Sequence, residues 1–325
     1  MRQYIFLLRE HPYITPVIVA LVIGFQAFGF VPHMTAHENY GDYWGSVIRE
    51  SYLCDILDFR NDGYGHYTRA PFKYWLNCAS FQLTGYPNYL PLIFNIGIMP
   101  MTYLLAVRLT NDKIIGLIAL ITIINIPLYS DWKYSGTYDM AWAFFMLTSI
   151  YFLYSEKKGS SILFGVSAAF KSLSIMYLPA WLYSAKQNKA WPSIIIIFIL
   201  FGVVWLFVEP KTIVGNQVGF FPENTEDALV SNLTVLWNVI PFFMGLCVLY
   251  AGFKGASPKH MKDVAIWLGW ILMTTPLIHM FTLQDTYGYR FVVFGAFLAI
   301  FTGQVLVRVA NWYTGTKLKI PINPL

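Results

Sequence analysis

Long apolar runs separated by short polar stretches dominate this chain. They recur at about 13–31, 89–107, 113–129, 138–154, 161–183, 191–208, 233–252, 264–282 and 291–309. Most approach the roughly 20 residues that an α-helix needs to cross the hydrocarbon core of a bilayer. The pattern predicts an all-α polytopic membrane protein. We expect one membrane domain over residues 1–325, without a separate C-terminal soluble domain.

One polar stretch, residues 33–88, is much longer than the others and follows the first apolar run. It holds six carboxylates and many aromatic residues. Long loops are usually functional or disordered, and the aromatic content argues against disorder. The residue pattern near 42–57 and 70–84 predicts two amphipathic helices within the loop. We expect this first outer loop to carry chemistry.

The distribution of charge predicts the topology. Nine simple crossings would place the basic segment 186–189 outside, against the positive-inside rule. The conflict disappears if 160–186 forms two short helices that turn near Lys171, which gives about ten transmembrane helices and two cytoplasmic termini. Lys and Arg residues then number 14 inside and 7 outside, with Lys171 set apart at the hairpin tip, and acids number 4 inside and 13 outside. The chain is expected in the cell (inner) membrane, with its active face extracytoplasmic.

Composition supports this class and excludes others. The chain is 57% hydrophobic and 12% charged, with a mean hydropathy of +0.52, so its net charge of +5 reflects topology and does not indicate nucleic-acid binding. The six histidines have no metal-site spacing. Cys54 and Cys78 can pair in an oxidising compartment, but we expect two free thiols. The first apolar run lacks a small-residue cleavage site, which favours a retained signal anchor.

Three carboxylates in two parts of the chain are candidates for catalysis. Glu38 and Asp42 lie just outside the first helix, and either can serve as a general base or help to hold a divalent cation. Asp139 opens the run 138–154, where a carboxylate also suits the positive end of a helix dipole. Ordinary solvated or capping acids are the alternative at each position.

Cations on the same predicted face are candidates for binding an anion. Arg69 and Lys73 flank a proline at the start of an amphipathic segment, and Arg290 begins the last apolar run. Arginine forks suit phosphate, although headgroup anchoring or a structural ion pair is the alternative. Lys171 is deep in an apolar run, where it either binds a ligand or pairs at the hairpin tip.

Taken in order, these elements resemble the GT-C polytopic glycosyltransferases. Residues 69–76, Arg-Ala-Pro-Phe-Lys-Tyr-Trp-Leu, look like the Lys-Pro-Pro-Leu-x-x-Trp-Leu element of the aminoarabinose and protein-mannosyl transferase branches. Later elements of that family are resembled by three further parts of the chain: Pro127 with Asp139, residues 165–171, and residues 289–291. Arg69 and Ala70 replace a Lys and a Pro, and Thr68 stands where the aminoarabinose branch has Glu.

The resemblance implies a GT-C-like bundle that transfers a sugar from a polyprenyl-phosphate-linked donor to a glycan, lipid or protein acceptor. It implies Asp42 or Glu38 as base and Asp139 as a second carboxylate. Four cations are implied at the donor phosphate: Arg69, Lys73, Lys171 and Arg290. The resemblance implies no certain cofactor, and whether a Mg²⁺ or Mn²⁺ ion binds at Asp42 and Asp139 stays open. A transporter or flippase, and a non-catalytic subunit of a cell-envelope complex, are the alternatives.

Overall fold

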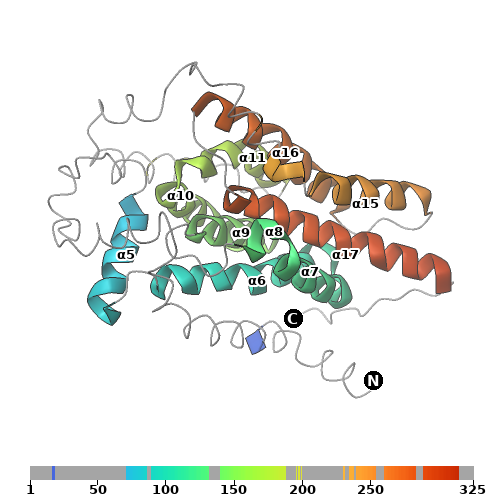
Figure 1. Ribbon diagram of the computed structural model, residues 1–325, viewed down its shortest axis with the longest axis horizontal. Helices are drawn as coiled ribbons and strands as arrows, with labels where there is room; N and C mark the ends of the chain where they lie inside the picture. The colour runs from blue at the N-terminus through green and yellow to red at the C-terminus, as the bar shows by residue number, and fades with distance from the viewer. Residues whose placement is uncertain are drawn as a thin grey trace.

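The chain is described by a computed structural model over residues 17–18, 71–85, 89–131, 140–187, 195, 197, 199, 230, 234–237, 239–253, 260–282 and 288–314. Their regular structure is helical, with no strand among these residues (Figure 1). In chain order the elements are α5 (Pro71–Thr84), α6 (Tyr89–Thr110), α7 (Lys113–Asn125), α8 (Pro127–Ser130), α9 (Ala141–Tyr154), α10 (Ser160–Phe170), η4 (Ser172–Tyr177), α11 (Leu178–Gln187), α15 (Ile240–Gly252), α16 (Met261–Thr282), η6 (Gly288–Phe291) and α17 (Val292–Thr314). The expectation of an all-α protein is confirmed for this part of the chain.

Two helices in the described part are long and apolar enough to cross a membrane. They span Tyr89–Thr110 and Val292–Tyr313, with mean hydropathies of 1.8 and 2.0. Shorter apolar helices, among them α7, α9, α10 and α15, contribute to the same core. The predicted runs 13–31 and 191–208 lie almost wholly outside the described residues, so the number of about ten membrane helices stays a prediction.

Local sequence explains where α7 begins and ends. Asn111 has a left-handed backbone (φ 55°), which asparagine tolerates, and it closes α6. The Asp112 side chain then caps α7 by accepting the N–H of Ile114 at 2.8 Å. Pro127 lacks an N–H and disfavours helical backbone at Ile126, so α7 stops there. The run 113–129, predicted as one span, is therefore two pieces, α7 and α8.

The predicted break near Lys171 is confirmed. Lys171 has an extended backbone (φ −156°, ψ 120°) between α10 and η4. The helix before it runs antiparallel to α9. The Ser167 hydroxyl donates to the Trp142 carbonyl at 2.6 Å, and the Ser149 hydroxyl donates to the Ser160 carbonyl at 2.6 Å. The start of α9 thus lies beside the end of α10.

The helix after the break runs back alongside α9. Tyr177 stacks on Trp142, with ring centroids 6.0 Å apart, near the start of α9. Ser184 is hydrogen-bonded to the Tyr154 hydroxyl at 3.0 Å, at the end of α9. Since α11 is parallel to α9 and α10 is antiparallel to it, residues 160–187 form the expected helical hairpin with Lys171 at its tip.

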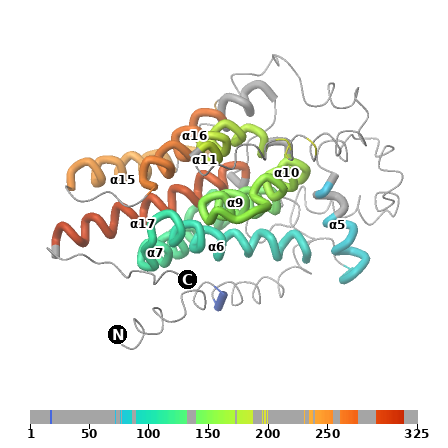
Figure 2. The backbone as a smooth tube through the Cα atoms, turned by 180° about the vertical axis from the view of Figure 1, so that it is seen from behind, coloured from blue at the N-terminus to red at the C-terminus, as the bar shows by residue number. Residues whose placement is uncertain are grey.

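The bundle has two ends, which we call the Lys171 end and the Arg108 end (Figure 2). Asn95 of α6 contacts Met140 at the Lys171 end, where α9, α11, α15 and α17 begin and where α7, α10 and α16 finish. Arg108 contacts Tyr154 at the opposite end. All candidate site residues in described helices belong to the Lys171 end.

Helix α17 lies in the middle of the bundle, between α15 and α16 on one side and α7 and α8 on the other (Figure 1). In its most apolar 18-residue window, 83% of the residues are buried. Glycine allows this close packing. A Cβ atom at Gly303 would lie 2.8 Å from the backbone oxygen of Ile115 in α7. The middle of α17 is thereby held against the first turn of α7.

Charges separate between the two ends as the positive-inside pattern predicts. In the described helices and turns, the basic residues of the Arg108 end are Arg108, Lys113, Lys157, Lys158, Lys186, Lys262 and Arg308. Those of the Lys171 end are Lys73, Lys171 and Arg290. The side of the membrane that each end faces stays a prediction.

One expectation about the cysteines is wrong. Cys78, which is 3% exposed in α5, is disulfide-bonded, whereas Cys247 is free. Cys54 lies outside the described residues. The local sequence favoured free thiols, but whether two thiols pair depends on their distance in the folded chain.

Candidate functional site

Lys171 is held at the tip of its hairpin by main-chain hydrogen bonds. Its N–H donates to the Ser167 carbonyl at 3.0 Å, and its own carbonyl accepts from the Ser174 N–H at 3.0 Å. These bonds satisfy the backbone on both sides of the break in α10. The Lys171 side chain is half-buried, so a cation stands at the end of the bundle on a defined backbone.

Two fully buried serines join the two arms of this tip. The hydroxyls of Ser167 and Ser174 lie 2.7 Å apart, and the Ser174 hydroxyl also lies 3.1 Å from the Ser167 carbonyl. Ser167 donates to the Trp142 carbonyl, which ties the tip to the start of α9. Trp270 of α16 donates to the Met176 carbonyl at 2.7 Å, which ties η4 to a further helix.

Arg290 lies in η6, the short 3₁₀ helix that leads into α17, and is only 7% exposed. Its place follows from packing of η6 and the start of α17 against α8. A Cβ atom at Gly295 would lie 3.6 Å from the Leu128 Cβ. A cation so deeply buried in an apolar bundle requires polar or anionic neighbours. Binding of an anion by Arg290 stays a prediction.

Helix α5 brings the first outer loop to the same end. The ring of Phe72 meets that of Phe170 edge-on, with centroids 5.7 Å apart. Phe170 is the residue before Lys171, and Phe72 is the residue before Lys73. The backbone of Lys73 therefore lies at the Lys171 end, and its role at a phosphate stays a prediction.

Five phenylalanine rings from α5, α6, α9 and α10 pack together next to the Lys171 tip. Phe94 lies 5.2 Å from Phe145 and 6.4 Å from Phe170, and Phe145 stacks on Phe170 at 5.3 Å. Phe72 and Phe144 complete this phenylalanine cluster. Four of the five rings are only partly buried, so the cluster presents aromatic surface.

Asn95 connects several of these elements. Its side chain is fully buried, and its Oδ1 atom accepts the Met140 N–H at 2.8 Å. Its own carbonyl accepts the Tyr129 hydroxyl at 3.0 Å. Sequence reasoning missed Asn95, although an amide inside the apolar run 89–107 is itself a signal, because polar groups are expensive within a bilayer.

The remaining predicted residues lie outside the described part of the chain. They are Glu38, Asp42, Arg69 and Asp139, although Asp139 directly precedes Met140. Their roles stay predictions, as does a Mg²⁺ or Mn²⁺ ion at Asp42 and Asp139. Among the described residues, no group of three His, Cys, Asp or Glu side chains gathers to hold a metal ion.

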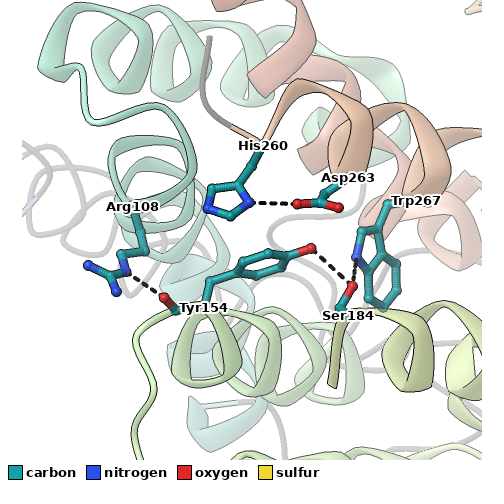
Figure 3. A network of polar contacts seen from close by, with 6 residues as sticks. All are labelled: Arg108, Tyr154, Ser184, His260, Asp263 and Trp267. Atoms are coloured by element: carbon teal, nitrogen blue, oxygen red, sulfur yellow. Dashed lines mark hydrogen bonds and ion pairs between the residues drawn. The ribbon is translucent and has the colours of Figure 1, made fainter. Parts of the chain in front are cut away.

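A second polar network lies at the Arg108 end (Figure 3). Asp263 of α16 meets the His260 ring at 2.6 Å, and Ser184 links the Tyr154 hydroxyl to the Trp267 indole. These contacts join α9, α11 and α16. The network links these three helices at the end opposite the candidate site. Neither the charges nor the residue spacing in the sequence predicted these contacts.

Comparison with known proteins gives a structural match only. No protein-family model and no curated protein matches the chain. Two solved structures of ArnT from Cupriavidus metallidurans are similar to it, each with a TM-score of 0.62. One is bound to undecaprenyl phosphate, at 13% identity, and the other is in the apo state, at 15% identity.

The match covers 93% of this chain and 61% or 60% of the ArnT chain. The chain therefore spans about three-fifths of the length of the structures it resembles. At these identities the similarity establishes the fold. The chain therefore shares the fold of ArnT, in keeping with the resemblance seen in the sequence motifs.

Proposed function

We propose that the protein is a membrane glycosyltransferase that moves a sugar from a polyprenyl-phosphate donor to an acceptor at the extracytoplasmic face. One observation carries the proposal: a fold shared with ArnT gathers the predicted cations Lys171, Arg290 and the Lys73 backbone at one end of the bundle. ArnT has been solved with undecaprenyl phosphate bound, which is a ligand of the proposed donor class.

The proposed reaction is a displacement at the anomeric carbon of the donor sugar. The acceptor oxygen forms a bond to this carbon as the carbon–oxygen bond to the phosphate breaks, and polyprenyl phosphate leaves with the bonding electrons. Asp42 or Glu38 takes the proton of the acceptor, and Asp139 orients the acceptor. The cations Arg69, Lys73, Lys171 and Arg290 stabilise the charge that develops on the phosphate.

The phenylalanine cluster supports a lipid donor. It lies directly beside the Lys171 tip and leaves four rings partly exposed. An isoprenoid chain is apolar and packs well on aromatic surface. A donor whose phosphate meets Lys171 has this surface within reach of its first isoprene units.

Binding of undecaprenyl phosphate to the purified protein tests the phosphate assignment. Arg290→Ala should weaken binding at least tenfold, because loss of a hydrogen bond to a charged group costs about 1.5–3 kcal/mol. Arg290→Lys should weaken it less, since lysine keeps the charge but loses the planar fork. Arg308→Ala is the matched control, because Arg308 lies at the Arg108 end.

The outcomes separate binding from stability. Arg308 donates to the Phe253 carbonyl and lies 4.1 Å from the Tyr250 ring centroid, so its loss should lower the melting temperature and leave binding per folded molecule unchanged. If Arg290→Ala behaves in the same way, Arg290 does not bind the phosphate. If undecaprenyl-phosphate-linked sugars are bound but never transferred by the wild-type protein, the enzymatic assignment is wrong.

A further inference from the structure

Asn95 is hydrogen-bonded to two elements at the Lys171 end, the start of α9 and α8. It is 0% exposed and sits in α6, where the neighbouring positions Leu92, Ile96 and Ile98 belong to the core. A buried amide in such a run is costly unless its polar atoms are satisfied. Asn95 has no part in the proposed chemistry, so the question is what its amide holds.

The first element is the start of α9. The N–H that Asn95 accepts at 2.8 Å belongs to the peptide bond between Asp139 and Met140. Met140 is the N-cap of α9, and its own side chain makes no capping hydrogen bond. The amide oxygen of Asn95 therefore holds, from another helix, the backbone of Met140, the residue that follows the predicted carboxylate Asp139 in the sequence.

The second element is α8. The Tyr129 hydroxyl, on a fully buried side chain, donates to the Asn95 carbonyl at 3.0 Å. Helix α8 packs in turn against η6, which carries Arg290. The same residue of α6 is therefore linked to the segment before α9 and to the surface on which Arg290 rests.

We infer that Asn95 is a positioning residue, which sets the start of α9 at Met140 and, through Tyr129 and α8, the Arg290 segment relative to each other. The inference rests on the proposed sugar transfer. Catalysis depends on such registration, since a misplacement of about 1 Å can cost on the order of a hundredfold in rate. Asn95 acts on the reaction only through these two elements.

The test compares Asn95→Ala with Thr102→Val in the full-length protein. Thr102 is also fully buried in α6, but its hydroxyl donates only to the Ile98 carbonyl of its own helix. Asn95→Ala should lower kcat for transfer from an undecaprenyl-phosphate-linked sugar by about tenfold to a hundredfold, with little change in the donor KM. Thr102→Val should stay close to wild type.

Amide hydrogen exchange gives a readout that does not depend on activity. In Asn95→Ala, the amides at the start of α9 should exchange faster, while those near the end of α9 should not. Equal exchange in Asn95→Ala and wild type would overturn the inference even if the protein transfers sugar. If exchange increases as expected but wild type shows no transfer, the proposed function fails and the positioning contact stands.

Tyr129→Phe provides a second variant that removes one hydroxyl and keeps the ring. Loss of the Tyr129 hydroxyl's neutral hydrogen bond to the Asn95 carbonyl corresponds to about a fivefold change in an equilibrium constant. We expect weaker binding of undecaprenyl phosphate by about that factor, because the variant loosens α8 beneath Arg290. Unchanged binding in Tyr129→Phe, together with unchanged kcat in Asn95→Ala, would overturn both arms of the inference.

Discussion

Single side chains in this protein have different tasks at the two ends of the bundle. At the Arg108 end, Arg108 donates to the Tyr154 carbonyl at 2.7 Å and Arg308 donates to the Phe253 carbonyl at 2.7 Å. Each arginine thus satisfies a carbonyl at the end of a neighbouring helix. Arg290 lies instead in η6, at the start of α17, and its proposed partner is the donor phosphate.

The serine pair at the Lys171 tip provides a test at the scale of one atom. Ser174→Ala removes the hydroxyl that lies 2.7 Å from Ser167 and should lower the free energy of unfolding by about 1 kcal/mol. Thermal unfolding in detergent measures the change. Thr148→Val is the control, because that hydroxyl donates only within α9. A smaller loss for Ser174→Ala than for Thr148→Val would show that the pair does not hold the tip.

Helices in this bundle approach each other closely where glycine replaces a side chain. Gly303 of α17 faces the backbone of α7, and Gly116 of α7 faces Tyr103 and Val107 of α6. A Cβ atom at Gly116 would lie 2.5 Å from a Val107 methyl group. Apolar side chains gain little from burial between helices within a bilayer, so close packing supplies much of the association.

The change in stability when a glycine is replaced by alanine should therefore depend on which atoms surround the new methyl group. Gly303→Ala brings a methyl group into the Ile115 carbonyl, which cannot move without its helix, and should destabilise the protein by about 1–3 kcal/mol. Gly245→Ala in α15 has no atom within 4 Å of the new Cβ and should be neutral or stabilising by up to about 1 kcal/mol. Melting temperatures of the two variants check this. Equal effects would contradict the packing described for α7 and α17.

The described helices have a basic end and, opposite it, an end that holds the candidate site residues. Disulfides form in oxidising compartments, and Cys78 is disulfide-bonded in α5, which reaches the Lys171 end. Basic residues concentrate at the opposite end, as they do on the cytoplasmic side of membrane proteins. Both observations, independent of each other, favour an extracytoplasmic Lys171 end.

Cysteine labelling tests this orientation. Asn111 and Asp131 are exposed at opposite ends of the α7–α8 segment. In a Cys247→Ser background, a membrane-impermeant maleimide should label Asp131→Cys in intact cells and label Asn111→Cys only after permeabilisation. Labelling of both positions from the same side would refute the topology, and labelling in the reverse order would invert it.

The sequence alone determined the class of the protein and the order of its elements. Apolar runs are local, so the boundaries of α6 and α16 and the amphipathic α5 follow from composition and period. The break at Lys171 was predictable because a lysine in an apolar run conflicts with a continuous membrane helix. The break before Pro127 carried an equally local signal, the missing N–H of proline, but the uninterrupted apolar run concealed it.

Only the tertiary structure decided which residues meet. Asn95 and the Asp139–Met140 peptide are 45 positions apart at their contacting residues, and nothing in either run specifies the other as its partner. The same holds for the buried serines of the tip and for the disulfide of Cys78. Hydropathy reports how much of a segment leaves water but not which neighbour covers it. That choice depends on packing and hydrogen-bond geometry, which exist only once the helices have assembled.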